Sequence, residues 1–162
     1  MFTILKSGSI SGIEGSVIDV EVDISKGLPG FSIVGLPDSA VKESKERVRT
    51  AIINSGHKFP QNRITINLAP AGIRKEGAGF DLSIAAAIIS SIYSIDPETI
   101  DGYMIVGELA LNGEIKPVNG VLSLAITAKE KGLKGIIVPY DNGDEAAAIT
   151  EIGVVTVRSL ND

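Results

Sequence analysis

The chain has 162 residues, with no cysteine, no tryptophan and one histidine, and it contains only four Phe and three Tyr. Without cysteine there can be no disulfide, thiolate metal site or Cys nucleophile, as expected in a reducing compartment. So few aromatic residues leave little surface on which single-stranded nucleic acid could stack. A single histidine, His57, cannot form a two-His metal site. We expect it to have a surface or helix-capping role.

The chain also has fewer basic residues than acidic ones. Lys and Arg number 15 against 20 Asp and Glu, which gives a formal net charge of −5. This argues against a broadly basic nucleic-acid binder and leaves room for a local basic patch. Long apolar runs are missing, because the most apolar stretch, 82–92, is too short and too rich in Ala and Ser to span a bilayer. We therefore expect a cytoplasmic protein with no membrane partner.

What remains is an ordinary globular composition, 44% apolar and 22% charged. It predicts one domain over 1–162, with a subdivision into lobes 1–100 and 101–162 as an alternative. Alternation of apolar and acidic residues over 17–24 predicts a strand with one solvated face. Asn112-Gly113 within 109–115 predicts a hairpin with a type I′ turn.

The order of elements indicates an α/β or α+β domain with a mixed sheet. Asp38 or Ser39 is expected to cap the first helix, and Asp81 the second. The expected strands cover 2–10, 16–24, 31–34, 63–68, 103–106, 135–138 and 154–157, of which 31–34 is expected to be short and buried. The expected helices cover 39–54, 82–91, 121–131 and 144–149.

The glycines offer no phosphate-binding loop. Gly30 to Gly35 has the glycine interval of a P-loop, but Leu36-Pro37 follows where Lys and Ser or Thr are needed. These glycines are therefore interpreted as turn residues.

The charged loop before the second helix allows two interpretations. Arg74, Lys75 and Glu76 form a solvated loop, or the two cations form an anion or partner site at a helix start. On the first helix, Lys42, Lys45 and Arg49 lie near one face with Glu residues interspersed, which fits a mixed solvated surface or a phosphate-reading stripe. The candidate contacts to DNA or a partner are Arg74, Lys75, Lys42 and Lys45.

Two segments resemble the framework of a Lon-type serine peptidase domain. Residues 75–82, KEGAGFDL, are similar to the segment that carries the Lon nucleophile, and 107–120, GELALNGEIKPVNG, to its second signature. The resemblance implies a Lon proteolytic-domain-like βα fold with an N-terminal β-hairpin lobe. It places Gly79 in the Ser slot and Leu122 in the Lys slot. A Ser-Lys dyad needs a hydroxyl and an amine, so no catalytic residue is predicted.

Two serines lie near these slots. Ser83 is displaced by about one helical turn and Ser123 by one residue, which moves each side chain by several Å or to another face.

A closer resemblance covers nearly the whole chain. The motifs GLPG at 27–30, VGLPD at 34–38, ESKERVR at 43–49, INLAP at 66–70 and PVNGV at 117–121 together resemble the N-terminal domain of the YifB/ComM family, which is also described as magnesium-chelatase-like. Ser83 departs from the family pattern, where Pro commonly follows Phe-Asp-Leu.

The resemblance implies an AAA+ ATPase module C-terminal to such a domain. ATP and Mg²⁺ would be held in that module, and no cofactor or metal is expected within residues 1–162. The implied partners are that module, sibling subunits of a hexamer, and DNA during branch migration in natural transformation. We therefore predict a non-catalytic Lon-like accessory domain that serves assembly, docking or DNA contact. The alternatives are a Lon-type peptidase with a displaced nucleophile and a magnesium-chelatase-like subunit.

Overall fold

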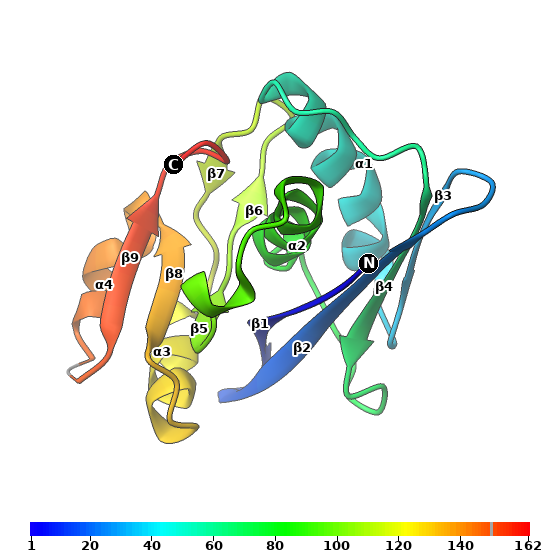
Figure 1. Ribbon diagram of the computed structural model, residues 1–162. Helices are drawn as coiled ribbons and strands as arrows, with labels where there is room; N and C mark the ends of the chain where they lie inside the picture. The colour runs from blue at the N-terminus through cyan, green and yellow to red at the C-terminus, as the bar shows by residue number, and fades with distance from the viewer. Residues whose placement is uncertain (150) are drawn as a thin grey trace.

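The computed structural model describes residues 1–149 and 151–162, in which an N-terminal β-hairpin precedes a mixture of helices and strands (Figure 1). The strands are β1 (Phe2–Ser11), β2 (Glu14–Ser25), β3 (Gly30–Val34), β4 (Arg63–Ala69), β5 (Tyr103–Ile105), β6 (Glu108–Leu109), β7 (Ile115–Lys116), β8 (Gly135–Pro139) and β9 (Gly153–Val157). The helices are α1 (Ser39–Asn54), α2 (Asp81–Tyr93), α3 (Val121–Glu130) and α4 (Gly143–Ala147), with 3-10 turns η1 (Pro97–Thr99) and η2 (Tyr140–Asn142).

The main sheet has seven strands in the order β3-β4-β2-β1-β5-β8-β9. Strand β2 pairs antiparallel with β1 and β4, whereas the β3–β4, β1–β5, β5–β8 and β8–β9 pairs are parallel. The predicted α/β class with a mixed sheet is confirmed. The sheet runs without interruption through both proposed lobes, and their division stays a prediction.

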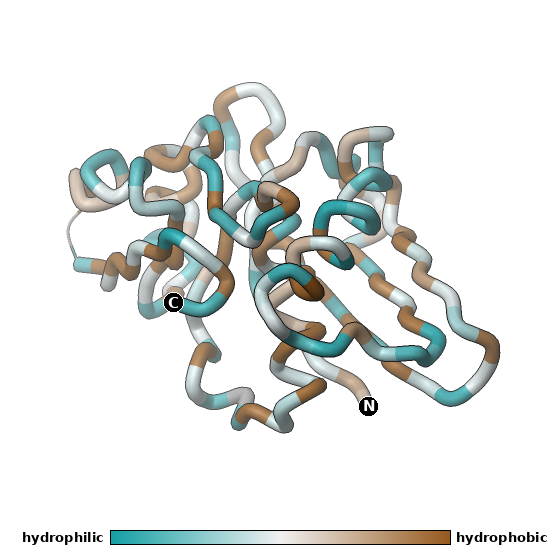
Figure 2. The backbone as a smooth tube through the Cα atoms, turned by 90° about the horizontal axis from the view of Figure 1, so that it is seen from above, coloured by the Kyte–Doolittle hydropathy of each residue, from teal (hydrophilic) through white to brown (hydrophobic). Residues whose placement is uncertain are grey.

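The N-terminal hairpin shows how the sequence pattern becomes a sheet face. Its register pairs Phe2 with Asp23 and Ser11 with Glu14. Along β2 the apolar residues Ile18, Val20 and Val22 are fully buried, and the acidic residues between them are partly exposed. Hydrophobic and hydrophilic residues alternate along the strands in Figure 2. The strand predicted from this alternation is confirmed.

Helices cover both faces of the sheet (Figure 1). Helices α1 and α2 pack over one face, where the larger core gathers residues such as Val48, Ile66 and Ile88. Helices α3 and α4 pack on the other face, where Met104 and Ile136 belong to a second core. Within the described residues, no helix is long and apolar enough to cross a membrane.

Two local predictions about the strands and their turns are wrong. The β6–β7 hairpin exists, but its loop closes from the Ala110 N–H to the Glu114 carbonyl at 2.9 Å, and only Gly113 has a positive φ, of 92°. A type I′ turn needs positive φ at both central residues, so this is a three-residue loop. The strand at Gly30–Val34 was expected to be buried, yet it lies at the sheet edge with Val34 48% exposed.

Candidate functional site

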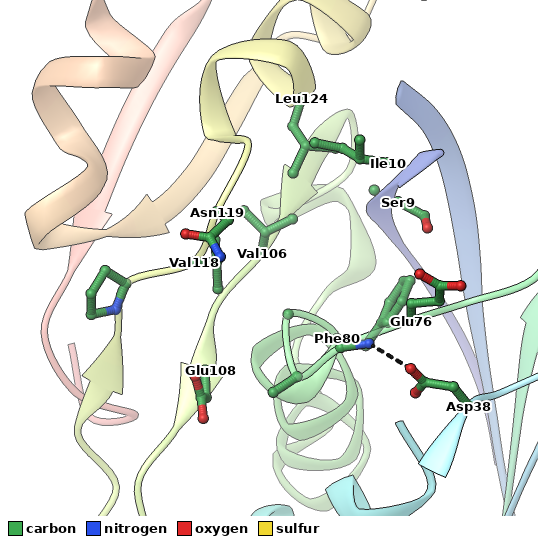
Figure 3. A pocket seen from close by; sticks show the side chains of 15 residues that line it. Ser9, Ile10, Asp38, Glu76, Phe80, Val106, Glu108, Val118, Asn119 and Leu124 are labelled. Atoms are coloured by element: carbon green, nitrogen blue, oxygen red, sulfur yellow. Dashed lines mark hydrogen bonds between the residues drawn. The ribbon is translucent and has the colours of Figure 1, made fainter. Parts of the chain in front are cut away.

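A cleft of about 500 Å³ opens where β1 and β5 part (Figure 3). Its walls come from the C-terminal part of β1, the start of α1, the loop before α2, the β5–β6 link and the loop before α3. The lining residues are Gly8, Ser9, Ile10, Asp38, Glu76, Gly77, Ala78, Gly79, Phe80, Val106, Glu108, Pro117, Val118, Asn119 and Leu124. Both Lon-like segments therefore meet at one place, as their resemblance implies.

Asp38 ties one wall of the cleft together. Its Oδ1 accepts the Val41 N–H at 2.8 Å, which confirms the predicted cap of α1, and its Oδ2 accepts the Gly77 N–H at 3.2 Å. The backbone adds two bonds, from the Asp38 N–H to the Lys75 carbonyl at 2.9 Å and from the Lys75 N–H to the Leu36 carbonyl at 3.0 Å. The glycine-rich loop is thus held against the start of α1.

Asn142 holds the opposite wall. Its side chain accepts the Val118 N–H at 2.9 Å and donates to the Val118 carbonyl at 3.0 Å. The residue is 6% exposed, so this paired contact is shielded from water. The loop that carries Val118 and Asn119 is fixed by a residue 24 positions away in sequence.

The two residues in the Lon catalytic slots behave differently. Gly79 lines the cleft, and a Cβ built on it would lie 3.8 Å from Val118 Cγ1, so a side chain has room there. Leu122 is 41% exposed and outside the lining, and its N–H donates to Glu145 Oε2 at 3.0 Å. Of the two residues, Gly79 therefore lines the cleft and Leu122 does not.

Nearby serines were the remaining candidates for a hydroxyl nucleophile. Ser83 is fully buried, and its Oγ donates to the Phe80 carbonyl at 2.9 Å. Ser9 was not predicted, yet it lines the cleft with 9% exposure, and its hydroxyl has no hydrogen-bond partner within the described part of the chain. The cleft lining contains no Lys or His among the described residues.

Asp81 follows the cleft residue Phe80, and the prediction that it caps α2 is wrong. The N-cap residue is Phe80, without a side-chain cap, whereas the Asp81 carboxylate is fully buried. Arg47 Nε donates to Asp81 Oδ2 at 2.7 Å, Ser44 Oγ donates to Oδ1 at 2.5 Å, and the Leu109 N–H donates to Oδ2 at 3.0 Å. These contacts join α1, α2 and β6.

Arg47 is the cation of this network. Its hydrogen bond to Asp81 raises the pKa of the guanidinium, opposed by burial and helped by the charges of Asp81, Glu108 and Glu43. Glu43, one helical turn before Arg47, also pairs with it at 3.7 Å, and this glutamate is 71% exposed. The buried partner is the stronger one, because water and salt screen the exposed one.

Lys75 contradicts its predicted place among the surface contacts. The residue is fully buried, and its Nζ donates to the Pro70 carbonyl. Burial lowers the pKa of this amine because desolvation disfavours the charged form. An ammonium with no exposed surface cannot meet DNA, so Lys75 is removed from that set.

The other three predicted cations lie at the surface to different degrees. Arg74 is exposed, but its Nε lies 3.3 Å from Glu76 Oε1, so a carboxylate partly neutralises it. Lys42 is exposed and Lys45 half-buried on α1. Within 1–149 and 151–162, no group of three or more His, Cys, Asp or Glu is arranged to hold a metal ion.

His57 links three segments at the molecular surface. Its Nδ1 lies 2.6 Å from the Tyr93 hydroxyl and its Nε2 lies 2.8 Å from Asn161 Oδ1. The side chain is partly exposed, and the contacts connect the end of α1 to α2 and to the C-terminal residues. The predicted surface role fits this position.

Two groups of site residues were missed from the sequence. Ser44 falls three residues after Val41 and four before Val48, so a polar residue on the apolar stripe of α1 was a signal of the buried network. Ser9, Glu108 and Asn119 carried no such signal. They come from separate segments, and only the tertiary structure brings them to one cleft.

Comparison with known proteins matches this framework. The family described as "Subunit ChlI of Mg-chelatase" matches residues 20–142. The chain is 47% identical over 158 residues to the uncharacterized protein YifB of Escherichia coli, covering 98% of the chain and 31% of that protein. It is 38% identical over 159 residues to competence protein ComM of Haemophilus influenzae, with 98% and 31% covered.

A more distant similarity concerns a peptidase. The chain is 33% identical over 168 residues to Lon protease 2 of Bacillus subtilis, covering 91% of the chain and 29% of that protein. The chain thus spans about a third of the length of the curated relatives that it matches.

Proposed function

The chain belongs to the family described as subunit ChlI of Mg-chelatase, and from this we propose that it is a non-catalytic, Lon-like accessory domain of a larger ATPase that resembles YifB and ComM. Its proposed work is to assemble or dock the motor and to contact DNA. One observation carries the non-catalytic part: Gly79, without a side chain, lines the cleft at the place where the Lon resemblance puts the nucleophile.

The chemistry supports this proposal. Acyl transfer by a Ser-Lys pair needs an oxygen nucleophile and a nearby amine that takes its proton. Gly79 offers no oxygen, and Leu122 offers no lone pair and lies outside the cleft. The Lys75 amine donates to the Pro70 carbonyl, and no hydrogen bond between a serine hydroxyl and a lysine amine occurs in the described residues.

A peptidase with a displaced nucleophile is the competing function, and Ser9 is the specific observation in its favour. Its hydroxyl faces the cleft without a partner in the described structure. Incubation with a fluorophosphonate, followed by intact-mass analysis, tests this hydroxyl, with Ser9→Ala as matched control and a Lon protease as positive control. We expect neither labelling of the chain nor turnover of unfolded casein. A label that disappears in Ser9→Ala would establish the peptidase instead.

An apolar groove supports docking. It encloses about 420 Å³ between α2 and strands β5, β8 and β9, and its lining includes Ile137, Val155 and Leu160. Val155 is 42% exposed although it lies on the sheet, and Ile95 at the groove is 41% exposed. Side chains of this kind are stabilised when another surface covers them.

The docking proposal is tested on the protein translated from the complete reading frame, by light scattering with and without ATP. Val155→Asp should reduce assembly, because it places a charge in the apolar groove. Val34→Asp is the matched control, since Val34 is a similarly exposed valine on the opposite sheet edge. Equal assembly of both variants and the parent would argue against this surface.

DNA contact is the third part of the proposal, and it rests on Arg74, Lys42 and Lys45 now that Lys75 is buried. Fluorescence anisotropy with single-stranded and branched DNA at low salt measures it. The triple Ala variant should bind more weakly, because a protein with fewer cations on the phosphates releases fewer counterions from the DNA. Lys26→Ala with Lys131→Ala is the control, as both lysines are exposed. Unchanged binding in the triple variant would reject these three residues.

A further inference from the structure

Strand β1 has an open edge in the cleft. The only pairing of β1 with β5 joins Lys6 to Met104. Beyond this point the chain after β5 leaves β1, because the Gly107 N–H, which would face β1 if the strand continued, donates to the Gly79 carbonyl instead. The stretch 8–11 of β1 therefore pairs with β2 alone among the described residues.

The direction of the free backbone groups follows from the neighbouring bonds. The Lys134 N–H donates to Gly102 and the Val106 N–H to Ile137, so Gly102 and Val106 face β8. Residues alternate along a strand, so Tyr103 and Ile105 face β1 and bond there to Lys6. By the same alternation Gly8 and Ile10 turn their N–H and carbonyl groups toward the cleft.

A polar side chain at this edge also lacks a partner. Ser9 is 9% exposed and lines the cleft, and no described residue bonds its hydroxyl. Figure 3 shows it on the same wall as Asp38 and Glu76. No buried side-chain N or O atom of the described residues lacks a hydrogen-bond partner, so the Ser9 hydroxyl is open to the cleft, where a bound chain could contact it.

The charge and shape of the cleft restrict the ligand. Asp38, Glu76 and Glu108 line it, and no cationic side chain of the described residues does. Two arginines outside the lining offset part of this charge, since Arg74 pairs with Glu76 and the charge of Glu108 acts on Arg47. The cleft lining itself carries only acidic side chains among its charged residues. Apolar side chains such as Phe80, Val118 and Leu124 form the rest of the wall, and a nucleic acid would be repelled.

From these observations we infer that the cleft binds an extended polypeptide segment with basic side chains, which adds as a strand to the open edge of β1 at Gly8 and Ile10. Main-chain hydrogen bonds to such an edge give affinity, and alternate side chains give specificity. The bound segment stays intact because Gly79 provides no nucleophile. Binding itself does not depend on the assembly or DNA role proposed above.

The probe is a fluorescein-labelled, capped hexapeptide of alternating lysine and valine, measured by anisotropy at low salt. An alternating glutamate and valine peptide tests charge. A lysine–valine peptide with alternate backbone nitrogens methylated tests strand addition, because it keeps the side chains and loses N–H donors. We expect each control peptide to bind at least about tenfold more weakly.

Variants locate the binding site. Gly79→Leu fills the cleft and should weaken binding about tenfold, and Glu108→Gln should weaken it by a smaller factor of roughly three. Glu130→Gln, an exposed residue at the far end of α3, should leave binding unchanged. Because Gly79→Leu could unfold the chain, amide NMR shifts of the unchanged protein provide a second readout, with the largest changes expected at Gly8–Ile10 and 77–79.

Failure of this inference and failure of the proposed function give different experimental results. No binding, equal binding of the basic and acidic peptides, equal binding of the methylated peptide, or shifts confined to another surface would each overturn the inference. Cleavage of the bound peptide, seen by mass spectrometry, would contradict the non-catalytic proposed function while binding at β1 stood. Failure of assembly or DNA binding would leave the peptide result unaffected.

Discussion

The starts of α1 and α2 carry the same residue type and use it in opposite ways. Asp38 precedes α1, and its carboxylate accepts the Val41 N–H of the first turn at 2.8 Å. Asp81 is the first residue of α2, and its carboxylate bonds to Arg47, Ser44 and Leu109 from other elements. The first aspartate serves its own helix, and the second joins three elements.

The free N–H groups of α2 are satisfied in another way. The Leu82 N–H donates to the Gly107 carbonyl at 3.0 Å, across a contact between distant segments. A helix start needs acceptors for its first N–H groups, but it does not need them from a side chain. At the start of α2 a tertiary contact supplies this acceptor, so the Asp81 carboxylate can bond to residues of other elements instead.

Removing the buried carboxylate should give the largest effect. Asp81→Ala leaves Arg47 and the Leu109 N–H without their partner, and we expect a loss of roughly 3–5 kcal/mol in the free energy of unfolding. Urea denaturation followed by circular dichroism measures it. Asp81→Asn keeps the shape and part of the hydrogen bonding and should lose less. Equal stability of Asp81→Ala and the parent would show that the Asp81 network does not stabilise this fold.

The cap of α1 should have an intermediate effect. Asp38→Ala loses the acceptor of the Val41 N–H and the hydrogen bond from Gly77, which should cost about 1–2 kcal/mol of unfolding free energy. Asp38→Asn caps nearly as well, so denaturation of this control should resemble the parent. A loss of unfolding free energy as large as that of Asp81→Ala would show that Asp38, like Asp81, does more for stability than cap its own helix.

The buried Lys75, in the loop between these two helix starts, should have a smaller effect on stability that depends on pH. Burial lowers its pKa from the ordinary 10.5, so the folded protein binds fewer protons than the unfolded chain between the two pKa values. Stability from this group therefore rises as pH rises through that window. Thermal unfolding at alkaline pH should show this rise in the parent and a flatter curve in Lys75→Met.

The matched control is Lys26→Met, because Lys26 is exposed in a loop. Its stability should follow the parent curve over the same pH range. A Lys75→Met curve parallel to the parent would contradict a desolvated amine at this position.

The surface pair of α1 should contribute least. Glu43 is 71% exposed and lies 3.7 Å from Arg47, so Glu43→Gln should change the free energy of unfolding by less than about 0.5 kcal/mol. Chemical denaturation at low and high salt checks this, with the exposed Glu46→Gln as control. A change above about 1 kcal/mol would mean that Arg47 depends on its exposed partner as well as on Asp81.

The sequence predicted most elements because their signals are local. Alternation located β2, the Asp38 cap located the start of α1, and the helix expected over 121–131 agrees with α3 to within one residue. The hairpin was also predicted, but its turn type was wrong, because Asn112-Gly113 fits more than one loop and only backbone angles distinguish them. The candidate site followed from the sequence only in part. Gly79, which the Lon resemblance places in the nucleophile slot, lines the cleft, whereas Lys75, predicted as a surface contact, is buried.

By itself the sequence determined the mixed α/β architecture and the absence of a hydroxyl and an amine in the two Lon slots, because residue identity and periodicity are local properties. Only the tertiary structure decided that Asp81 joins Arg47, that Lys75 is buried, and that Ser9 faces a cleft at an open strand edge. Burial and partnership depend on which distant segments meet. The same side chain is therefore solvated, paired or left without a partner according to its neighbours.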